Sequence, residues 1–279
     1  MDNLIMSDAI GVFDSGIGGL SVLNEIKKTL PNEALIYFGD QAHVPYGARS
    51  LEQVLEFSIS ITEFLISLGS KMIVVACNTA SAAALKELRI QFPAIPFVGM
   101  EPAIKPAVEH SISGAVGVLA TPATFQSELY ASVIERFAHG VKIYQDTCSG
   151  LVQEIEKGHF EGKKTKQILE KALHPMLSNK IDAVVLGCTH YPFVIPLIQS
   201  IVGPKVQVID PAPAVARQVK KIFNQLDHDL NPKTNRSNEI ISSGNILKLK
   251  KVIAKFYPFE NSLNQAYWVE QDQTLKVTQ

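Results

Sequence analysis

The sequence has 279 residues, which is enough for one large or two ordinary domains. Hydrophobic residues make up 46% and charged residues 19%, so a sizeable buried core is expected and a disordered chain is not. A net charge of −1 argues against nucleic acid or an anionic membrane as the main partner. No apolar stretch reaches the length of about 18 residues that a membrane crossing needs, and residues 1–8 lack the features of a signal peptide. Three cysteines, an odd number without a disulfide framework, predict a cytoplasmic location with reduced thiols.

Short apolar runs alternate with longer segments of helical periodicity along the first part of the chain. The strands and helices predicted there are, in chain order, strand 9–13, helix 20–30, strand 35–38, helix 51–68, strand 72–76, helix 79–92 and strand 97–99. This alternation predicts parallel strands that are joined by right-handed crossovers.

The same pattern restarts after the segment 101–106, which we expect to be a crossover. The predicted elements are then strand 115–120, helix 125–137, strand 141–144, helix 150–157, helix 164–177, strand 181–186 and strand 206–209. Residues 11–15 (GVFDS) match residues 117–121 (GVLAT), and Cys77 matches Cys188 at nearly the same offset, which indicates an internal duplication. We therefore predict an α/β protein with two pseudo-symmetric doubly wound parallel-sheet domains that face a shared cleft.

The C-terminal part predicts a helix over 210–226, a polar surface loop over 227–238, a strand at 239–243 and a helix at 246–256. We expect this part of the chain to return to the first domain. The predicted domains are therefore residues 1–98 together with 211–279, and residues 99–210.

Each half of the chain has an apolar strand that ends in a cysteine followed closely by threonine. These segments are 74–81 (VVACNTAS) with Cys77 and 184–192 (VVLGCTHYP) with Cys188. Open α/β sheets bind ligands at the carboxyl ends of their strands, and a helix N-terminus is expected to lower the pKa of a cysteine beside it. A single free cysteine is often buried only for packing. Two at matching positions favour a reaction in which one thiolate removes a proton from a carbon and the other thiol protonates the opposite face.

Such a pair must keep unequal protonation states, which carboxylates and a histidine nearby can maintain. Asp14 follows the first strand and is a candidate neighbour of Cys77, although it could simply cap the next helix. His190 and Glu154 are candidates near Cys188, with a purely structural histidine and a surface carboxylate as the respective alternatives. A zinc site made by Cys77, Cys188, His190 and Asp14 is a rival, although the Cys-Thr-His spacing matches no common zinc motif.

Glycines and hydroxyl groups also recur where ligands are expected. The segment 14–19 (DSGIGG) can offer backbone N–H groups to a phosphate or carboxylate, but it fits neither a dinucleotide nor a P-loop motif. The hydroxyls at the strand ends belong to Ser15, Thr79, Thr121, Thr124 and Thr189. Because Arg49 is the only arginine in these loops, we infer a substrate whose carboxylates are held by N–H and hydroxyl groups. Each hydroxyl has helix capping as its alternative role.

Four segments together resemble the motifs of glutamate racemases, within the aspartate/glutamate racemase superfamily: 14–22 (DSGIGGLSV), 45–47 (PYG), 76–81 (ACNTAS) and 186–192 (LGCTHYP). The resemblance covers nearly the whole chain. It implies a cofactor-independent, two-base proton transfer that interconverts L- and D-glutamate and supplies D-glutamate for peptidoglycan synthesis, hence for cell-wall biogenesis and cell shape. It also implies a homodimer.

By matching motif, the resemblance implies that Cys77 deprotonates D-glutamate and Cys188 deprotonates L-glutamate, with assistance from Asp14, Glu154 and His190. The substrate-binding residues that it implies are Asp14, Ser15, Tyr46, Gly47, Asn78, Thr79, Thr121, Thr124, Thr189 and His190.

Three alternatives stay open at this point. The first is racemisation of aspartate or another amino acid, although His190 stands where aspartate racemases of the superfamily tend to have glutamate. The second is a non-catalytic carboxylate-binding protein, which would not need two thiols. The third is a thiol redox enzyme, which would need two cysteines within disulfide distance.

Overall fold

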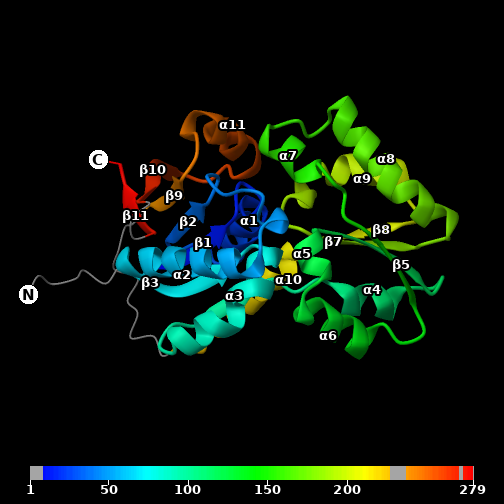
Figure 1. The fold of residues 1–279 in the computed structure, drawn as a ribbon, viewed down its shortest axis with the longest axis horizontal. Coiled ribbons are helices and arrows are strands. Elements are labelled where there is room, and N and C mark those ends of the chain that lie inside the picture. Colours follow the sequence, from blue (N-terminus) through cyan, green and yellow to red (C-terminus); the bar gives the residue numbers. More distant parts are fainter. Residues whose placement is uncertain (1–8, 227–236, 270–272, 279) are drawn as a thin grey trace, which may run out of the picture.

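The computed structural model describes residues 9–226, 237–269 and 273–278. Figure 1 shows that the elements gather into two lobes, each built on its own sheet. The first lobe contains β1 (Ala9–Asp14), α1 (Leu20–Thr29), β2 (Leu35–Gly39), η1 (Tyr46–Ala48), α2 (Leu51–Ser67), β3 (Ser70–Val75), α3 (Asn78–Gln91), β4 (Phe97–Gly99), α10 (Ala212–Phe223), β9 (Asn238–Ser242), α11 (Ile246–Phe256), β10 (Asn261–Val269) and β11 (Thr274–Val277).

The second lobe is made by the middle of the chain. It contains α4 (Ile104–His110), β5 (Ala115–Ala120), α5 (Pro122–Phe125), α6 (Glu128–Phe137), β6 (Lys142–Asp146), α7 (Leu151–Glu156), α8 (Lys163–Ser178), β7 (Ala183–Gly187), η2 (Tyr191–Val194), α9 (Ile195–Val202) and β8 (Gln207–Ile209).

The two sheets share one strand order, which is the signature of the duplication. Among the described residues, seven strands form the order β11-β10-β9-β2-β1-β3-β4, and four form the order β6-β5-β7-β8. The order β2-β1-β3-β4 and the order β6-β5-β7-β8 are equivalent, and every pairing within both sets is parallel. The predicted α/β class with two doubly wound parallel sheets is therefore confirmed. The equivalence of β3 and β7 also makes Cys77 and Cys188 counterparts.

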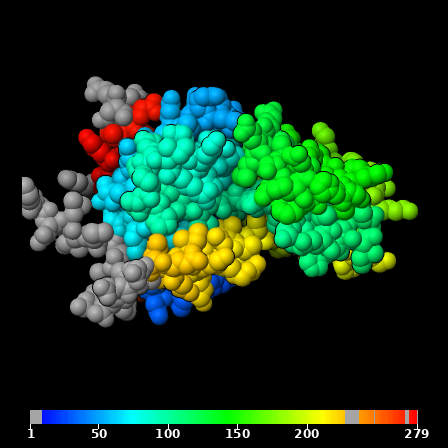
Figure 2. Space-filling view, turned by 90° about the horizontal axis from the view of Figure 1, so that it is seen from below, coloured from blue at the N-terminus to red at the C-terminus, as the bar shows by residue number. Residues whose placement is uncertain are grey.

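The helices that cover the sheets are amphipathic, and their buried faces anchor them. α10 is an example, because Val215, Val219 and Phe223 recur at helical spacing and are buried, while α10 packs against α1. Figure 2 shows α10, in yellow, lying along the first lobe at the underside of the molecule. Each buried side chain of this kind stabilises the fold by about 1.5–3 kcal/mol relative to exposure. α10 thus brings the chain back from the second lobe to the first.

The C-terminal strands extend the first sheet beyond what the sequence predicted. β9 pairs in parallel with β2, and β10 pairs in parallel with β9, but β11 runs antiparallel to β10, so the first sheet is not purely parallel. β10 and β11 were not predicted, because the segment 261–269 (NSLNQAYWV) has no continuous apolar run and only Ala266 within it is fully buried. The exact domain boundaries, 1–98 with 211–279 and 99–210, stay a prediction.

A few predicted elements need correction. The expected crossover at 101–106 contains the start of α4. The residues just after the predicted strand 115–120 form the short helix α5, and α9 was not predicted. A helix was expected to begin at residue 125, but α6 begins after Ser127, whose side chain accepts a hydrogen bond from the N–H of Tyr130. The predicted loop at 227–238 lies almost entirely outside the described residues. Within the described residues, none of the helices combines the length and the apolar character that a membrane crossing requires.

Candidate active site

The ends of β3 and β7 meet at a small cavity between the lobes. The lining residues are Ser15, Pro45, Tyr46, Gly47, Cys77, Asn78, Thr79, Thr121, Val152, Cys188, Thr189 and His190. The cavity has a free volume of only about 10 Å³, and each of the two cysteines is 5% exposed. The structure therefore brings most of the predicted site residues together in an almost closed space. Of the others, Asp14 lies behind Thr189, Thr124 lies against Thr121, and Glu154 lies elsewhere.

Cys77 is the N-cap residue of α3 and is separated from the end of β3 by Ala76. Its sulfur accepts a hydrogen bond from the N–H of Ala80 at 3.5 Å, and its thiol donates to the Ser15 hydroxyl at 3.9 Å. Burial, together with the charge of Asp14, raises the pKa of the Cys77 thiol, and the Ala80 N–H offsets only part of this effect. The helix N-terminus thus lowers the pKa of Cys77 as expected, but burial outweighs it, the net pKa is raised, and the thiol carries a proton at neutral pH.

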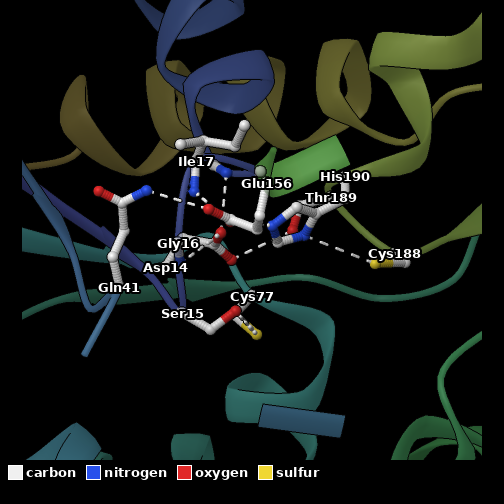
Figure 3. Close-up of polar contacts among 12 residues, drawn as sticks. Asp14, Ser15, Gly16, Ile17, Gln41, Cys77, Glu156, Cys188, Thr189 and His190 are labelled. Carbon is white, nitrogen blue, oxygen red and sulfur yellow. Dashed lines mark hydrogen bonds and ion pairs between the residues drawn. The ribbon is translucent and has the colours of Figure 1, made fainter. Parts of the chain in front are cut away.

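Cys188 has a different neighbour, the imidazole of His190. The distance from the Cys188 sulfur to Nδ1 of His190 is 3.8 Å, and Nε2 of His190 lies 2.6 Å from Oε1 of Glu156 (Figure 3). Burial by itself lowers the pKa of His190, but the hydrogen bonds and charges of Cys188 and Glu156 outweigh it and raise the pKa well above its ordinary value. His190 is therefore an imidazolium that directs an N–H at the sulfur.

The carboxylate beside His190 is Glu156, which corrects the prediction of Glu154. Glu154 instead accepts hydrogen bonds from Lys157, Lys164 and His159, which together hold its pKa at about 2. The two glutamates are two positions apart on α7, so their side chains leave different sides of the helix. Glu156 is four positions after Val152, which lines the cavity, so the two side chains share one face of α7. Because only the structure shows that Val152 lines the cavity, the sequence carried no signal that selects Glu156.

Glu156 bridges the two lobes through hydrogen bonds to the first lobe. It accepts from the N–H of Ile17 at 2.8 Å and from Nε2 of Gln41 at 3.0 Å (Figure 3). Burial raises the pKa of Glu156, but the hydrogen bond and charge of His190, with Gln41 and Ile17, outweigh burial and lower it. Glu156 is thus ionised and pairs with a charged His190. No role was expected for Gln41, whereas Ile17 belongs to the segment 14–19 whose N–H groups were expected to bind a ligand.

Asp14 is fully buried at the end of β1 and also connects the lobes. Its Oδ2 accepts hydrogen bonds from the N–H groups of Gly16 and Gly19, and its Oδ1 accepts from the Thr189 hydroxyl at 3.1 Å. Burial raises the pKa of Asp14 against the lowering effects of His190 and Gly19. Asp14 therefore binds the loop that precedes α1 and lies beside the cavity, but it does not cap that helix, whose N-cap residue is Gly19.

The glycine-rich segment 14–19 has a different role from the predicted one. The N–H groups of Gly16, Ile17 and Gly19 donate to the protein's own carboxylates, those of Asp14 and Glu156. A Cβ atom at Gly18 would lie 2.6 Å from Nδ1 of His190, so this position needs glycine for close approach of the lobes. A Cβ atom at Gly47 would similarly lie 2.6 Å from Cβ of Thr121.

Three of the hydroxyls at the strand ends form a connected group. The Thr79 and Thr121 hydroxyls lie 3.0 Å apart and join the two lobes, and the Thr121 and Thr124 hydroxyls lie 2.9 Å apart. Thr121 is also the N-cap of α5, so its capping and cavity-lining roles coexist. The Tyr46 hydroxyl donates to Asp40 at 2.7 Å, which leaves its ring to line the cavity.

Asn78 stands out among the lining residues. Its side-chain nitrogen and oxygen are buried, yet neither has a hydrogen-bond partner within the part of the chain that the structure describes. Buried amides without partners are uncommon because they cost free energy. Asn78 therefore offers one donor group and one acceptor to a bound ligand.

The geometry does not favour the zinc alternative. Among the described residues, no three side chains of histidine, cysteine, aspartate or glutamate are arranged to hold a metal ion. His190 uses both ring nitrogens within the protein, one toward Cys188 and one toward Glu156.

Known proteins resemble this chain in sequence and in fold. The family described as Asp/Glu/Hydantoin racemase matches residues 10–219. A glutamate racemase of Ectopseudomonas mendocina is 46% identical over 245 residues, which cover 88% of this chain and 92% of the relative. The crystal structure of Escherichia coli glutamate racemase, in complex with L-glutamate and the activator UDP-MurNAc-Ala, superposes with a TM-score of 0.82 at 30% identity, covering 98% of this chain and 100% of that one. Glutamate racemase from Francisella tularensis in complex with D-glutamate gives 0.78 at 32% identity, covering 93% and 97%.

Proposed function

Because the chain belongs to the Asp/Glu/hydantoin racemase family, we propose that its two cysteines interconvert L- and D-glutamate by direct proton transfer. The relatives that share 46–48% identity with this chain are glutamate racemases, so the chain is an amino-acid isomerase of that kind. The observation that carries the two-base assignment is the pair of cysteines at equivalent strand ends that line one enclosed cavity. D-glutamate made in this way supplies peptidoglycan synthesis.

In the L-to-D direction, the thiolate of Cys188 takes the α-proton of L-glutamate, so that the Cα–H bond breaks and an S–H bond forms. Cys77, which burial and Asp14 keep protonated, then gives its proton to the opposite face of the α-carbon. The reaction leaves Cys188 as a thiol and Cys77 as a thiolate. D-glutamate reacts from that arrangement by the same steps in reverse.

His190 supports the chemistry at Cys188. An imidazolium N–H directed at the sulfur stabilises negative charge there before the proton arrives. Glu156 keeps His190 charged and fixes its ring, because it binds the nitrogen on the far side of the ring. Glu156 thus takes the assisting role that the resemblance gave to Glu154. Asp14 holds Thr189, the residue between Cys188 and His190.

Polar groups around the cavity are suited to the substrate carboxylates and amino group. We propose that the unpartnered amide of Asn78 binds the substrate directly, with the hydroxyls of Ser15, Thr79, Thr121 and Thr189. These groups fit the inference that hydroxyl and amide donors take the place of an arginine. Tyr46 and Gly47 form another part of the cavity wall. The hydroxyl of Thr124 holds that of Thr121 in place.

The cavity must widen to admit glutamate, because its present free volume is smaller than an amino acid. A second cavity of about 180 Å³ shares Pro45, Gly47, Thr121 and Val152 with it. We propose that this shared wall, where Gly47 of the first lobe contacts Thr121 of the second, is where substrate passes when the lobes separate.

We further propose that the protein is a homodimer that acts in the cytoplasm without a cofactor. The three free cysteines at 77, 148 and 188 suit a reducing compartment. Light scattering on the purified protein measures its mass in solution, and a monomer at all concentrations would refute the dimer.

The test of the function is incubation of the protein with L-glutamate in deuterated water, with a metal chelator and without cofactor. We expect optical rotation to vanish while deuterium replaces the α-proton, with both changes followed by polarimetry and NMR. L-aspartate serves as the competing substrate. If neither amino acid exchanges its α-proton, the racemase proposal fails.

A further inference from the structure

The Glu156 carboxylate is held by three groups, namely His190 of its own lobe and Ile17 and Gln41 of the first lobe. Oε1 accepts from the N–H of Ile17 at 2.8 Å and faces Nε2 of His190 at 2.6 Å, whereas Oε2 accepts from Nε2 of Gln41 at 3.0 Å. Gln41 follows β2 and lies in the first lobe with Ile17, as Figure 3 shows. Gln41 is therefore the side-chain contact that fixes the second oxygen and hence the rotation of the carboxylate.

The orientation of the Gln41 amide is determined by the C-terminal part of the chain. The N–H of Gly244 donates to the Ser242 hydroxyl oxygen at 3.0 Å, and the Ser242 hydroxyl donates its own proton to Oε1 of Gln41 at 2.8 Å. With its oxygen occupied as an acceptor, Gln41 presents its NH₂ group to Glu156. A flipped amide would place its oxygen against the carboxylate and its NH₂ against a hydroxyl that donates.

The contact between this segment and Gln41 is close as well as polar. A Cβ atom at Gly244 would lie 2.5 Å from Cβ of Gln41, so the turn after β9 rests directly on the Gln41 side chain. Ser242 is fully buried at the end of β9, which pairs with β2. The strand that the C-terminal part adds to the first sheet is thereby connected, through Gln41, to the Glu156 carboxylate.

We propose, on the basis of the proposed racemase function, that Gln41 is a positioning residue for proton transfer at Cys188, oriented by Ser242. It acts through Glu156 and His190, and none of its hydrogen bonds reaches the Cys77 side of the cavity. Its loss frees Oε2, lets the carboxylate rotate, and weakens the alignment of the His190 N–H with the Cys188 sulfur. The barrier for proton transfer at Cys188 rises, and the barrier at Cys77 does not.

A higher barrier at Cys188 alone can be distinguished by experiment from a general loss of structure. The equilibrium constant of a racemisation is unity, so kcat/KM falls equally in both directions and does not identify the side affected. The isotope effect of an α-deuterated substrate does identify it, because it is expressed only when the step that removes the label limits the rate. L-glutamate loses its label to Cys188, and D-glutamate loses its label to Cys77.

The experiment compares Gln41→Leu, which keeps the size but removes the amide, with the unsubstituted full-length protein. We expect kcat/KM to fall about tenfold, since a hydrogen bond to a charged group has about that effect. The isotope effect on kcat/KM should rise for α-deuterated L-glutamate and fall toward one for α-deuterated D-glutamate. Ser242→Ala should shift both isotope effects in the same directions by less.

Ser243→Ala is the matched control. Ser243 is the next residue along, but its hydroxyl donates to Asp40 at 2.8 Å and not to Gln41, so the ratio of the two isotope effects should equal that of the unsubstituted protein. Isotope effects that are unchanged by Gln41→Leu, or that change alike for both enantiomers, would overturn the proposal. Thermal unfolding verifies that each variant is folded. Absence of racemisation by the unsubstituted protein would instead refute the proposed function, and this inference with it.

A double substitution tests the route through Glu156. If Gln41 acts only by holding that carboxylate, Gln41→Leu should reduce kcat/KM by less than about twofold in a Glu156→Gln background, against about tenfold alone. A full tenfold reduction in both backgrounds would contradict the route.

Discussion

The two sides of the cavity have the same topology and different chemistry. Cys77 and Cys188 follow the equivalent strands β3 and β7, yet the thiol of Cys77 faces a serine hydroxyl and a buried carboxylate, whereas the sulfur of Cys188 faces an imidazolium. A duplicated fold thus places two equivalent groups on opposite faces of a substrate. The residues that follow each strand make the two groups unequal, which a two-base mechanism requires.

The largest loss of activity is expected when either of the two thiols is removed. Cys77→Ala and Cys188→Ala should each reduce racemisation by about 1,000-fold or more, in the range that general acid–base groups contribute. The remaining thiol should still exchange the α-proton of one enantiomer only, L-glutamate for Cys77→Ala and D-glutamate for Cys188→Ala, as measured by NMR in deuterated water.

Cys148→Ala is the control for this prediction. Cys148 is buried and lines the second cavity, but not the one that contains Cys77 and Cys188, so its replacement should leave racemisation within a few-fold of the unsubstituted rate. Exchange of both enantiomers by either single-thiol variant would contradict the assignment of one thiol to each face.

The role of Glu156 beside His190 can be tested by two matched substitutions on α7. Glu156→Gln should lower kcat/KM by about 100-fold, whereas Glu154→Gln should change it little, because Glu154 binds Lys157, Lys164 and His159 instead. The dependence of kcat/KM on pH provides a second test of the role of Glu156. Glu156 and Cys188 raise the pKa of His190, so the imidazolium is present below this raised pKa and is lost only as pH rises through it.

Removal of the Glu156 charge lowers the pKa of His190. The alkaline limb of kcat/KM should therefore move to lower pH in Glu156→Gln, and it should stay in place in Glu154→Gln. If the two variants have the same profile, Glu156 is not the partner that keeps His190 charged.

Substitution of Asn78, the residue after Cys77, should change substrate binding without reducing the stability of the fold. Because its amide is buried without a partner in the described structure, Asn78→Ala should leave the free energy of unfolding unchanged or raise it by up to about 1 kcal/mol. The same change should raise KM by about tenfold through the loss of substrate hydrogen bonds. Calorimetry and steady-state kinetics measure the two effects, and a variant that loses stability without any change in KM would contradict the binding role.

The smallest expected effect is that of Ser15→Ala, which should change the two isotope effects in the directions opposite to those of Gln41→Leu. Ser15→Ala removes the acceptor of the Cys77 thiol, and because that contact is long at 3.9 Å, kcat should fall only about two- to threefold, in addition to a rise in KM from the loss of the substrate contact proposed for Ser15. The isotope effect should then rise for α-deuterated D-glutamate and fall for the L enantiomer, opposite to Gln41→Leu. Shifts in the same direction for both variants would show that the two sides do not act independently.

Sequence patterns were informative where the physical signal is local. The apolar runs at β1, β3, β5 and β7 become fully or largely buried strands, and the hydroxyls after them line the cavity or stand directly behind it. Cys77, Cys188 and His190 lie where the duplication and the motifs placed them. Elements with weak local signals, such as β10 and β11, were not found, because their position depends on a sheet edge that the rest of the chain provides.

The sequence by itself determined the two strand-end cysteines, the duplicated α/β architecture and the family, because periodicity and motifs are properties of neighbouring residues. Only the tertiary structure decided which glutamate serves His190 and which residues hold it, since Glu156 bonds to Gln41 across 115 positions and Gln41 bonds to Ser242 across 201. It also decided the pKa of Cys77, where the helix N-terminus that the sequence predicts is outweighed by burial and by Asp14. Burial and long-range pairing depend on the packing of the whole molecule, and no local pattern specifies them.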